Sequence, residues 1–282
     1  MESAIRLAAE IDRNVLVALA EDIGGGDLTA QLTPADGRSI GTVVTREDAV
    51  LAGSAWFDAC FLRLDPQAKI AWTARDGDCI AAGQTLCYIE ANTRAMLTAE
   101  RAALNFLQLL SATATVTRRH VDAVKGTRAT IVDTRKTIPG LRLAQKYAVT
   151  RGGGGNHRLG LYDGILIKEN HIIAAGGVKS ALQRARAIAH AGVFIQIEVE
   201  TLEQLREALD ADARMILLDN MSLARMREAV ELNGGRAKLE ASGGVTLETV
   251  RAIAETGVDR ISIGGLTKDV RAIDLSLRHS ET

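Results

Sequence analysis

Residues 194–219 read FIQIEVETLEQLREALDADARMILLD, and this stretch decides the fold class. Its first six residues and its last five are rich in Ile, Leu and Val, as buried strands are, and the segment between them has a helical pattern. A strand, a helix and a second strand in this order predict two parallel strands joined by a helical crossover. The stretch therefore indicates an α/β fold.

The same alternation continues through the second half of the chain. We predict strands at residues 129–134, 164–167, 194–199, 215–218, 238–241 and 260–263. Repeated βα units either close into a barrel or stay open as a doubly wound sheet. The predicted strands end in polar residues or glycine, namely Asp133, Lys168, Glu198, Asp219, Ser242 and Gly264. Because a barrel brings such strand ends to one mouth, the sequence favours an α/β barrel.

The first part of the chain has a different pattern. Apolar residues at helical spacing predict a helix over residues 3–22, which the glycines at 24–26 stop. Short alternating runs at 41–45, 69–73 and 86–90 predict a small antiparallel sheet, with a helix over 55–64 upon it. From Thr98 the pattern predicts one long helix, which we interpret as the bridge between two domains.

Composition and charge exclude several classes of protein. The chain has 34 basic and 35 acidic residues, so it has no net positive charge that would attract nucleic acid. No run approaches the roughly 18 apolar residues of a membrane span. Acidic residues near the N-terminus argue against a secretory signal, and we expect a cytoplasmic protein. Cys60, Cys79 and Cys87 have no metal or redox spacing, so we predict reduced packing residues.

Between Asp133 and Asn170 the chain is dense in cations. Guanidinium groups bind carboxylates in a bidentate manner, so Arg135 and Arg158 suit a flat dicarboxylate. Lys136 and Lys168 suit phosphate or pyrophosphate as point charges. The alternative is a solvated basic face, which fits Lys168 poorly because it follows an apolar run. Three further cations, Arg142, Lys146 and Arg151, lie on a predicted helix and are expected at its surface.

Two glycine turns come after late strands. Residues 241–245 (ASGGV) and 263–267 (IGGLT) precede predicted helices and can offer backbone N–H groups and a helix N-terminus to a phosphate. The alternative is that these glycines only make tight turns. The four-glycine run 152–155 lets His157 and Arg158 approach a ligand, although His157 also fits a satisfied histidine near the core.

Glu198 and Asp219 end consecutive predicted strands. Carboxylates at this position can bind ribose hydroxyls and hold Mg²⁺ through water, and ion pairs with the nearby basic residues are the alternative. No His or Cys grouping has the spacing of a zinc site. A small anionic ligand with Mg²⁺ is therefore the expected chemistry.

Taken together, several segments resemble the quinolinate phosphoribosyltransferase family, also called carboxylating nicotinate-nucleotide pyrophosphorylases. They occur in the family's order from residue 21 onward: EDIGGGDLT (21–29), TRKTIPGLR (134–142), KYAV (146–149), NHRLGL (156–161), ILIKENH (165–171), IEVE (197–200), LLDN (217–220), EASGG (240–244) and ISIGG (261–265).

The resemblance implies an architecture. It implies an N-terminal α+β sandwich-like domain over residues 1–112, with residues 270–282 packing back on it, and an incomplete, open α/β barrel of TIM-like type over 113–269. It also implies a homodimer or higher even oligomer with a shared active site. Arg101, within ERAALN (100–105), would reach the site of the neighbouring subunit.

The resemblance also implies an activity: transfer of phosphoribose from phosphoribosyl pyrophosphate to quinolinate with decarboxylation, in NAD biosynthesis. By this resemblance the quinolinate site is made by Arg101, Arg135, His157, Arg158 and Lys168. The phosphoribosyl pyrophosphate site is made by Lys136, Glu198, Asp219, Ser242, Gly243, Gly244, Ile263, Gly264 and Gly265. The catalytic residues would be Lys136, Lys168, Glu198 and Asp219, and the last two would hold Mg²⁺ through water.

Three rival functions remain open at this point. A related branch encoded with molybdate-transport functions shares much of the pattern and acts on another substrate. A non-catalytic phosphate or dicarboxylate sensor would not need Glu198 or Asp219. A sugar-phosphate isomerase would explain the glycine turns but not so many arginines.

Overall fold

The structure, a computed structural model, describes residues 2–281, and these divide into two compact units. The first unit comprises the chain up to Arg118, the segment Ile138–Gly153 and the chain from Asp269 onward. The second comprises Arg119–Thr137 and Gly154–Lys268. The segment predicted to be dense in cations is thus divided between the two units. The predicted boundaries after residues 112 and 269 stay a prediction.

The second unit is built on one six-stranded parallel sheet in the order β6-β11-β10-β9-β8-β7. The strands are β6 Thr130–Val132, β7 Gly164–Ile167, β8 Phe194–Val199, β9 Met215–Asp219, β10 Lys238–Ser242 and β11 Arg260–Ser262. Within the described residues β6 and β7 do not pair with each other, so the barrel is open. The predicted α/β fold with an incomplete barrel is confirmed.

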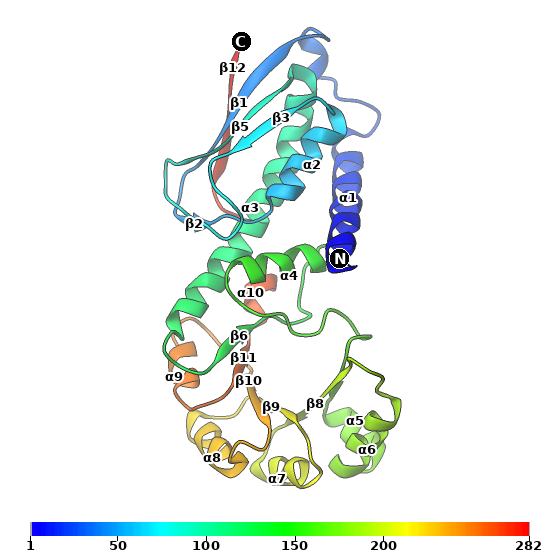
Figure 1. Ribbon diagram of the computed structural model, residues 1–282, viewed down its shortest axis with the longest axis vertical. Helices are drawn as coiled ribbons and strands as arrows, with labels where there is room; N and C mark the ends of the chain where they lie inside the picture. The colour runs from blue at the N-terminus through cyan, green and yellow to red at the C-terminus, as the bar shows by residue number, and fades with distance from the viewer. Residues whose placement is uncertain (1, 282) are drawn as a thin grey trace. The chain divides into compact units, whose positions relative to one another are not determined.

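Helices accompany this sheet, and Figure 1 shows α7, α8 and α9 on the outer side of its curve. In the described part of the unit they are α5 Glu169–Ala175, α6 Val178–Ile188, α7 Leu202–Asp210, α8 Leu223–Asn233, α9 Val250–Ala254 and α10 Gly265–Lys268. The crossover helices α7 and α8 begin where Thr201 and Ser222 accept a hydrogen bond from a backbone N–H of the first turn. The buried residues Leu205, Ala208 and Leu209 form the apolar side of α7.

Alternation along the strands separates apolar from polar side chains. In β8, Ile197 and Val199 are buried apolar residues, and Gln196 and Glu198 project to the opposite face. In β10, Leu239 and Ala241 alternate with Glu240 and Ser242 in the same way. The polar set faces the barrel interior, because Gln196 and Glu240 contact each other although β9 lies between their strands.

The first unit contains an antiparallel four-stranded sheet in the order β12-β1-β5-β3. Its strands are β1 Arg38–Thr45, β3 Lys69–Trp72, β5 Thr85–Asn92 and β12 Leu275–Glu281, and β2 Ala49–Val50 pairs with β4 Cys79–Ile80. Its helices are α1 Glu2–Ile23, the short 3₁₀ helix η1 Ala30–Leu32, α2 Ser54–Leu64, α3 Thr93–Ala123 and α4 Arg142–Arg151. Residues from the C-terminal end of the chain thus complete this sheet.

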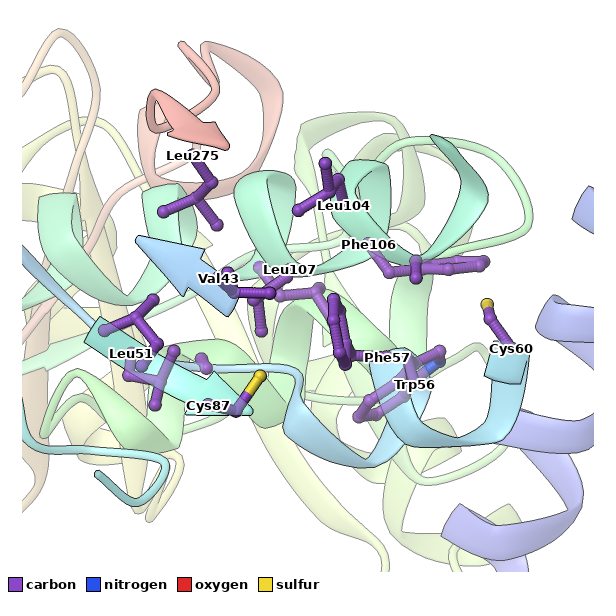
Figure 2. Packing of buried hydrophobic residues seen from close by; sticks show 14 of the residues in the cluster. Val43, Leu51, Trp56, Phe57, Cys60, Cys87, Leu104, Phe106, Leu107 and Leu275 are labelled. Atoms are coloured by element: carbon purple, nitrogen blue, oxygen red, sulfur yellow. The ribbon is translucent and has the colours of Figure 1, made fainter. Parts of the chain in front are cut away.

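The long helix α3 begins at Thr93, not at Thr98 as predicted. The side chain of Asn92 accepts a hydrogen bond from the N–H of Ala95, and this cap starts the helix earlier than apolar periodicity indicates. Figure 2 shows how Trp56 and Phe57 of α2 pack with Leu104 and Leu107 of α3 in the core of this unit.

Two expectations about single residues were wrong. Cys79 is exposed at the edge strand β4, whereas Cys60 and Cys87 are buried as predicted. Lys146 was expected at the surface of its helix but is only 1% exposed, because α4 packs as part of the first unit. Among the described residues, no helix is both long and apolar enough to cross a membrane.

Candidate active site

Four polar side chains lie at the ends of four neighbouring strands, β7 to β10. Asp219 of β9 and Ser242 of β10 lie directly opposite each other in the parallel register. Glu198 of β8 forms an ion pair with Lys168, which comes directly after β7, with 3.2 Å between Nζ and Oε2. Parallel strands place their carboxyl ends at one edge, and this edge is the mouth of the open barrel. We call Lys168, Glu198, Asp219 and Ser242 the strand-end cluster.

Lys168 lies in extended backbone directly before α5. Its N–H donates to Nδ1 of His171 at 3.0 Å, which fixes the first turn of that helix. The Lys168 side chain is about half exposed, whereas Glu198 is mostly covered. A flexible cation is thus held over a carboxylate at the mouth, where it can exchange that partner for an anionic ligand.

Arg135 and Arg158 form a second group, in which the positive charge of Arg135 acts on Arg158, and we call them the guanidinium pair. Arg158 is 9% exposed and donates from Nη1 to the carbonyl of Gly164 at 3.2 Å. Burial lowers the pKa of Arg158, the nearby positive charge of Arg135 lowers it further, and Asp163 opposes both effects. Two neighbouring cations repel each other, and a bound dianion relieves that repulsion.

His157 lies next to this pair because its segment pairs with β6. Gly155 bridges to Val132, and the N–H of His157 then donates to Oδ1 of the buried Asp133 at 2.8 Å. The His157 ring is buried, with Nδ1 accepting from the N–H of Arg158 and Nε2 at 2.8 Å from Oε1 of Gln196. Both ring nitrogens therefore have partners within the protein.

The contact of His157 with Gln196 continues to residues that were not predicted from the sequence. Gln196 donates to Oε2 of Glu240 at 3.1 Å, and Nε of Arg260 is 3.3 Å from the same oxygen. Gln196 and Glu240 are the polar residues that interrupt the apolar runs of β8 and β10. A polar residue between apolar neighbours inside a predicted strand was the available signal, because a barrel interior accepts it only with partners.

Lys136 and the turn at residues 263–265 lie together. The hydroxyl of Thr267 donates to the carbonyl of Lys136 at 2.8 Å, and the N–H of Lys136 donates to Oγ1 of Thr134. A Cβ at Gly264 would come within 2.9 Å of Cδ of Lys136. The glycine thus allows the Lys136 stem to lie close to the turn.

Gly243 makes room for Asn220 beside the strand-end cluster. Asn220 has a φ of 52°, donates to Oδ2 of Asp219 at 2.8 Å, and bonds through its N–H to the carbonyl of Ser242. A Cβ at Gly243, whose φ is 103°, would lie 2.0 Å from Oδ1 of Asn220. Only glycine satisfies both the positive φ and this close approach.

The two glycine turns lead into different structures, and one expectation was wrong. The turn at 263–265 leads directly into α10, which begins at Gly265. After Gly244, in contrast, α9 does not begin before Val250, because Thr246 and Thr249 first form a turn. The first glycine turn therefore offers backbone N–H groups of a loop and no helix N-terminus.

Arg101 belongs to the first unit and has an exposed side chain on α3. It lines a cavity of about 310 Å³ between α1, α3 and residues 139–141 of the same unit. Arg13 and Asn14 of α1 both donate to the carbonyl of Gly140 at the rim of this cavity.

Comparison with known proteins gives full-length matches. The model of the quinolinate phosphoribosyl transferase C-terminal domain matches residues 113–278, and that of the N-terminal domain matches residues 27–111. A probable carboxylating nicotinate-nucleotide pyrophosphorylase of Bacillus subtilis is 43% identical over 257 residues, which is 91% of this chain and 89% of that protein.

Two further proteins match most of this chain as well. A mitochondrial decarboxylating quinolinate phosphoribosyltransferase of Nicotiana tabacum is 42% identical over 282 residues, covering 93% of this chain and 80% of that protein. The solved structure of the nicotinate-nucleotide pyrophosphorylase from Francisella tularensis superimposes with a TM-score of 0.94 at 43% identity and covers 97% of both chains.

The role of Gly243 can be tested against its neighbour. Gly244 also has a positive φ, but a Cβ at this position would have no neighbouring atom within 4 Å. Because only the backbone conformation is then unfavourable, Gly244→Ala should lower the free energy of unfolding by about 1–2 kcal/mol. Gly243→Ala adds the clash with Asn220 and should cost about 1–3 kcal/mol more. Urea unfolding of both variants measures the difference. Equal losses would show that Asn220 moves away freely.

Proposed function

The chain belongs to the quinolinate phosphoribosyltransferase family, and we propose that it transfers phosphoribose from phosphoribosyl pyrophosphate to quinolinate with loss of CO₂, giving nicotinate mononucleotide and pyrophosphate. This is the reaction of a carboxylating nicotinate-nucleotide pyrophosphorylase, a step of NAD biosynthesis. The observation that carries the proposal is the identity of 43% across nine-tenths of the chain to a relative named for this reaction.

Quinolinate binds at the guanidinium pair in this proposal. A pyridine ring with two adjacent carboxylates brings two negative charges to the neighbouring positive charges of Arg135 and Arg158. Lys168 adds a mobile cation at the same mouth, His157 contributes beside Arg158, and Arg101 is contributed by a second subunit. The electrostatic effect of Arg135 on Arg158 supports a dianionic substrate over one with a single carboxylate.

Phosphoribosyl pyrophosphate binds along the strand ends. Lys136 and Lys168 meet the pyrophosphate, and Glu198 and Asp219 meet the ribose hydroxyls. The backbone of Ser242, Gly243 and Gly244, together with Ile263, Gly264 and Gly265, receives the 5′-phosphate. The proximity of Lys136 to Gly264 supports one continuous anion site.

Mg²⁺ fits this site as a partner of the substrate. The described residues contain no group of three or more His, Cys, Asp or Glu side chains that could hold a metal. Glu198 and Asp219 supply two carboxylates at neighbouring strand ends, and Mg²⁺ in such sites uses one or two carboxylates with substrate phosphates and water. When bound, the ion neutralises the charge that develops on the departing pyrophosphate.

In the first chemical step the quinolinate nitrogen forms a bond to C1 of the ribose while the bond from C1 to the pyrophosphate oxygen breaks. The arginine pair holds the ring so that its nitrogen faces C1. Lys136 and Lys168 stabilise the leaving oxygens, and the carboxylates of Glu198 and Asp219 stabilise the positive charge on C1.

In the second step the bond between C2 of the ring and its carboxylate breaks. The electron pair stays on C2, next to the cationic ring nitrogen that stabilises it, and CO₂ leaves. A proton then bonds to C2. The remaining 3-carboxylate stays bound by cations, which keeps the product oriented.

We also propose a homodimer, or a higher even oligomer, with sites shared between subunits. Leu28 and Leu32 near η1 are 82% and 85% exposed, and Val17 on α1 is exposed as well. In this proposal these exposed apolar side chains are covered where the subunits meet. The proposed domains are residues 1–112 with 270–282, and residues 113–269. A cytoplasmic location stays a prediction, since the Nicotiana tabacum relative is mitochondrial.

The function is tested with purified protein, quinolinate, phosphoribosyl pyrophosphate and Mg²⁺. We expect CO₂ and nicotinate mononucleotide in equal amounts, and an excess of chelator over Mg²⁺ should abolish both products. Lys168→Ala protein serves as the inactive control. If folded protein forms neither product but consumes phosphoribosyl pyrophosphate with another acceptor, the substrate is wrong and the family assignment remains.

The shared site is tested by mixing two inactive variants. Arg101→Ala and Lys168→Ala subunits each carry one defect, so a mixed dimer contains one site with both residues intact. We expect recovery of roughly a quarter to a half of the activity per dimer, depending on how the subunits mix. Verified mixed dimers without recovered activity would place Arg101 in the same site as Lys168 of its own chain.

A further inference from the structure

Every polar atom of the His157 side chain, and its backbone N–H, is used to hold its own segment in place. The backbone N–H donates to Asp133, Nδ1 accepts from the N–H of Arg158, and Nε2 contacts Oε1 of Gln196. The ring edge also packs on Phe194, with 5.5 Å between ring centroids. This arrangement is that of a residue that fixes its surroundings.

The contacts determine which ring nitrogen carries the proton. The N–H of Arg158 can only donate, so Nδ1 of His157 must be an acceptor and Nε2 carries the hydrogen. Nε2–H then donates to Oε1 of Gln196, and the amide nitrogen of Gln196 donates to Oε2 of Glu240. The direction of the whole chain of hydrogen bonds is set by these two constraints.

Glu240 reinforces this tautomer. Its side chain is 1% exposed, and its Oε2 also forms an ion pair with Nε of Arg260. Its other oxygen, Oε1, has no hydrogen-bond donor within the described residues and lies 3.5 Å from Nε2 of His157. The other neutral tautomer would turn an Nε2 lone pair toward the amide oxygen of Gln196 and the carboxylate oxygen of Glu240, which disfavours it.

Stability alone does not require such a network inside the barrel. Apolar side chains of similar volume often replace a buried ionic network without loss, whereas a buried polar network specifies one arrangement. Here the arrangement ends at Arg158, whose backbone N–H is bound by His157 and whose guanidinium is exposed to the positive charge of Arg135. The network therefore connects the barrel interior to the guanidinium pair.

We propose that Gln196 and Glu240 are positioning residues for dicarboxylate recognition. They hold His157 as the Nε2–H tautomer, and His157 through Nδ1 fixes the backbone that presents Arg158 to quinolinate. This inference rests on the proposed function, because the dicarboxylate is the quinolinate of that reaction. Neither residue touches the substrate.

The first test separates the KM values of the two substrates. Gln196→Met removes the amide while keeping its volume, and should raise the KM for quinolinate by about 10- to 100-fold through misplacement of Arg158. The KM for phosphoribosyl pyrophosphate should change less than about twofold, since its proposed ligands lie outside the network. Wild-type turnover of quinolinate is established first, so failure of the function and failure of this inference are distinct.

Asn233→Leu is the matched control. Asn233 is also a buried amide of this unit, and its side chain donates to the carbonyl of Ala237 and accepts from the Ala237 N–H, directly before β10. The variant should lower stability and leave both KM values unchanged. If Gln196→Met behaves like Asn233→Leu, with unchanged KM for quinolinate in folded protein, the positioning role is refuted.

A conservative exchange provides rescue. Gln196→Glu alone sets two carboxylates side by side and should impair quinolinate binding as Gln196→Met does. Combined with Glu240→Gln, it again pairs one carboxylate with one amide, so the donors and acceptors between residues 157, 196 and 240 match again, whereas Nε of Arg260 loses its acceptor at Oε2. The double exchange should recover part of the wild-type KM, so that its KM for quinolinate lies clearly below that of Gln196→Glu. A double variant as impaired as the single one would contradict the proposed chain.

The tautomer is measured directly in the substrate-free protein. With ¹⁵N-labelled histidine, His157 is assigned among the five histidines by its absence in His157→Gln protein. We expect protonated Nε2 and unprotonated Nδ1 in the wild type, and loss of this single form in Gln196→Met. A protonated Nδ1 in the wild type would overturn the inference whatever the kinetics.

Discussion

The period of two residues along parallel strands is the constraint on which the site depends. It sends Ile197 and Val199 of β8 to one face and Gln196 and Glu198 to the other. Because the strands run in parallel and in register, the inward polar residues form levels: Glu198 lies at the mouth and Gln196 beneath it. A shift of one residue in β8 or β10 would exchange an inward polar side chain for an apolar one.

The two levels differ in exposure and in how firmly their side chains are held. At the mouth, side chains such as Lys168 are partly exposed and can change partners when an anion arrives. Beneath it, Gln196 and Glu240 are buried and have fixed partners, as a supporting structure requires. In our proposal this support holds Arg158 within the positive field of Arg135, and a bound dianion relieves the repulsion between the two cations.

Much of this architecture could be predicted, since strand runs and their polar ends are local patterns, as at Glu198 and Asp219. The resemblance to a known family added Arg101, which no local pattern singled out. Burial of Lys146 could not be predicted, because it depends on α4 belonging to the first unit, a matter of tertiary packing. The partners of His157 were missed because residues 157, 196 and 240 are far apart in sequence and meet only inside the barrel.

The central claim is that the arginine pair recognises two adjacent carboxylates. Calorimetric titration of the protein with quinolinate and with nicotinate, which lacks the 2-carboxylate, tests it most directly. We predict that quinolinate binds at least about tenfold more tightly, a difference of about 1.4 kcal/mol or more. Equal affinity for the two ligands, or tighter binding of nicotinate, would show that Arg135 and Arg158 do not form a dicarboxylate site.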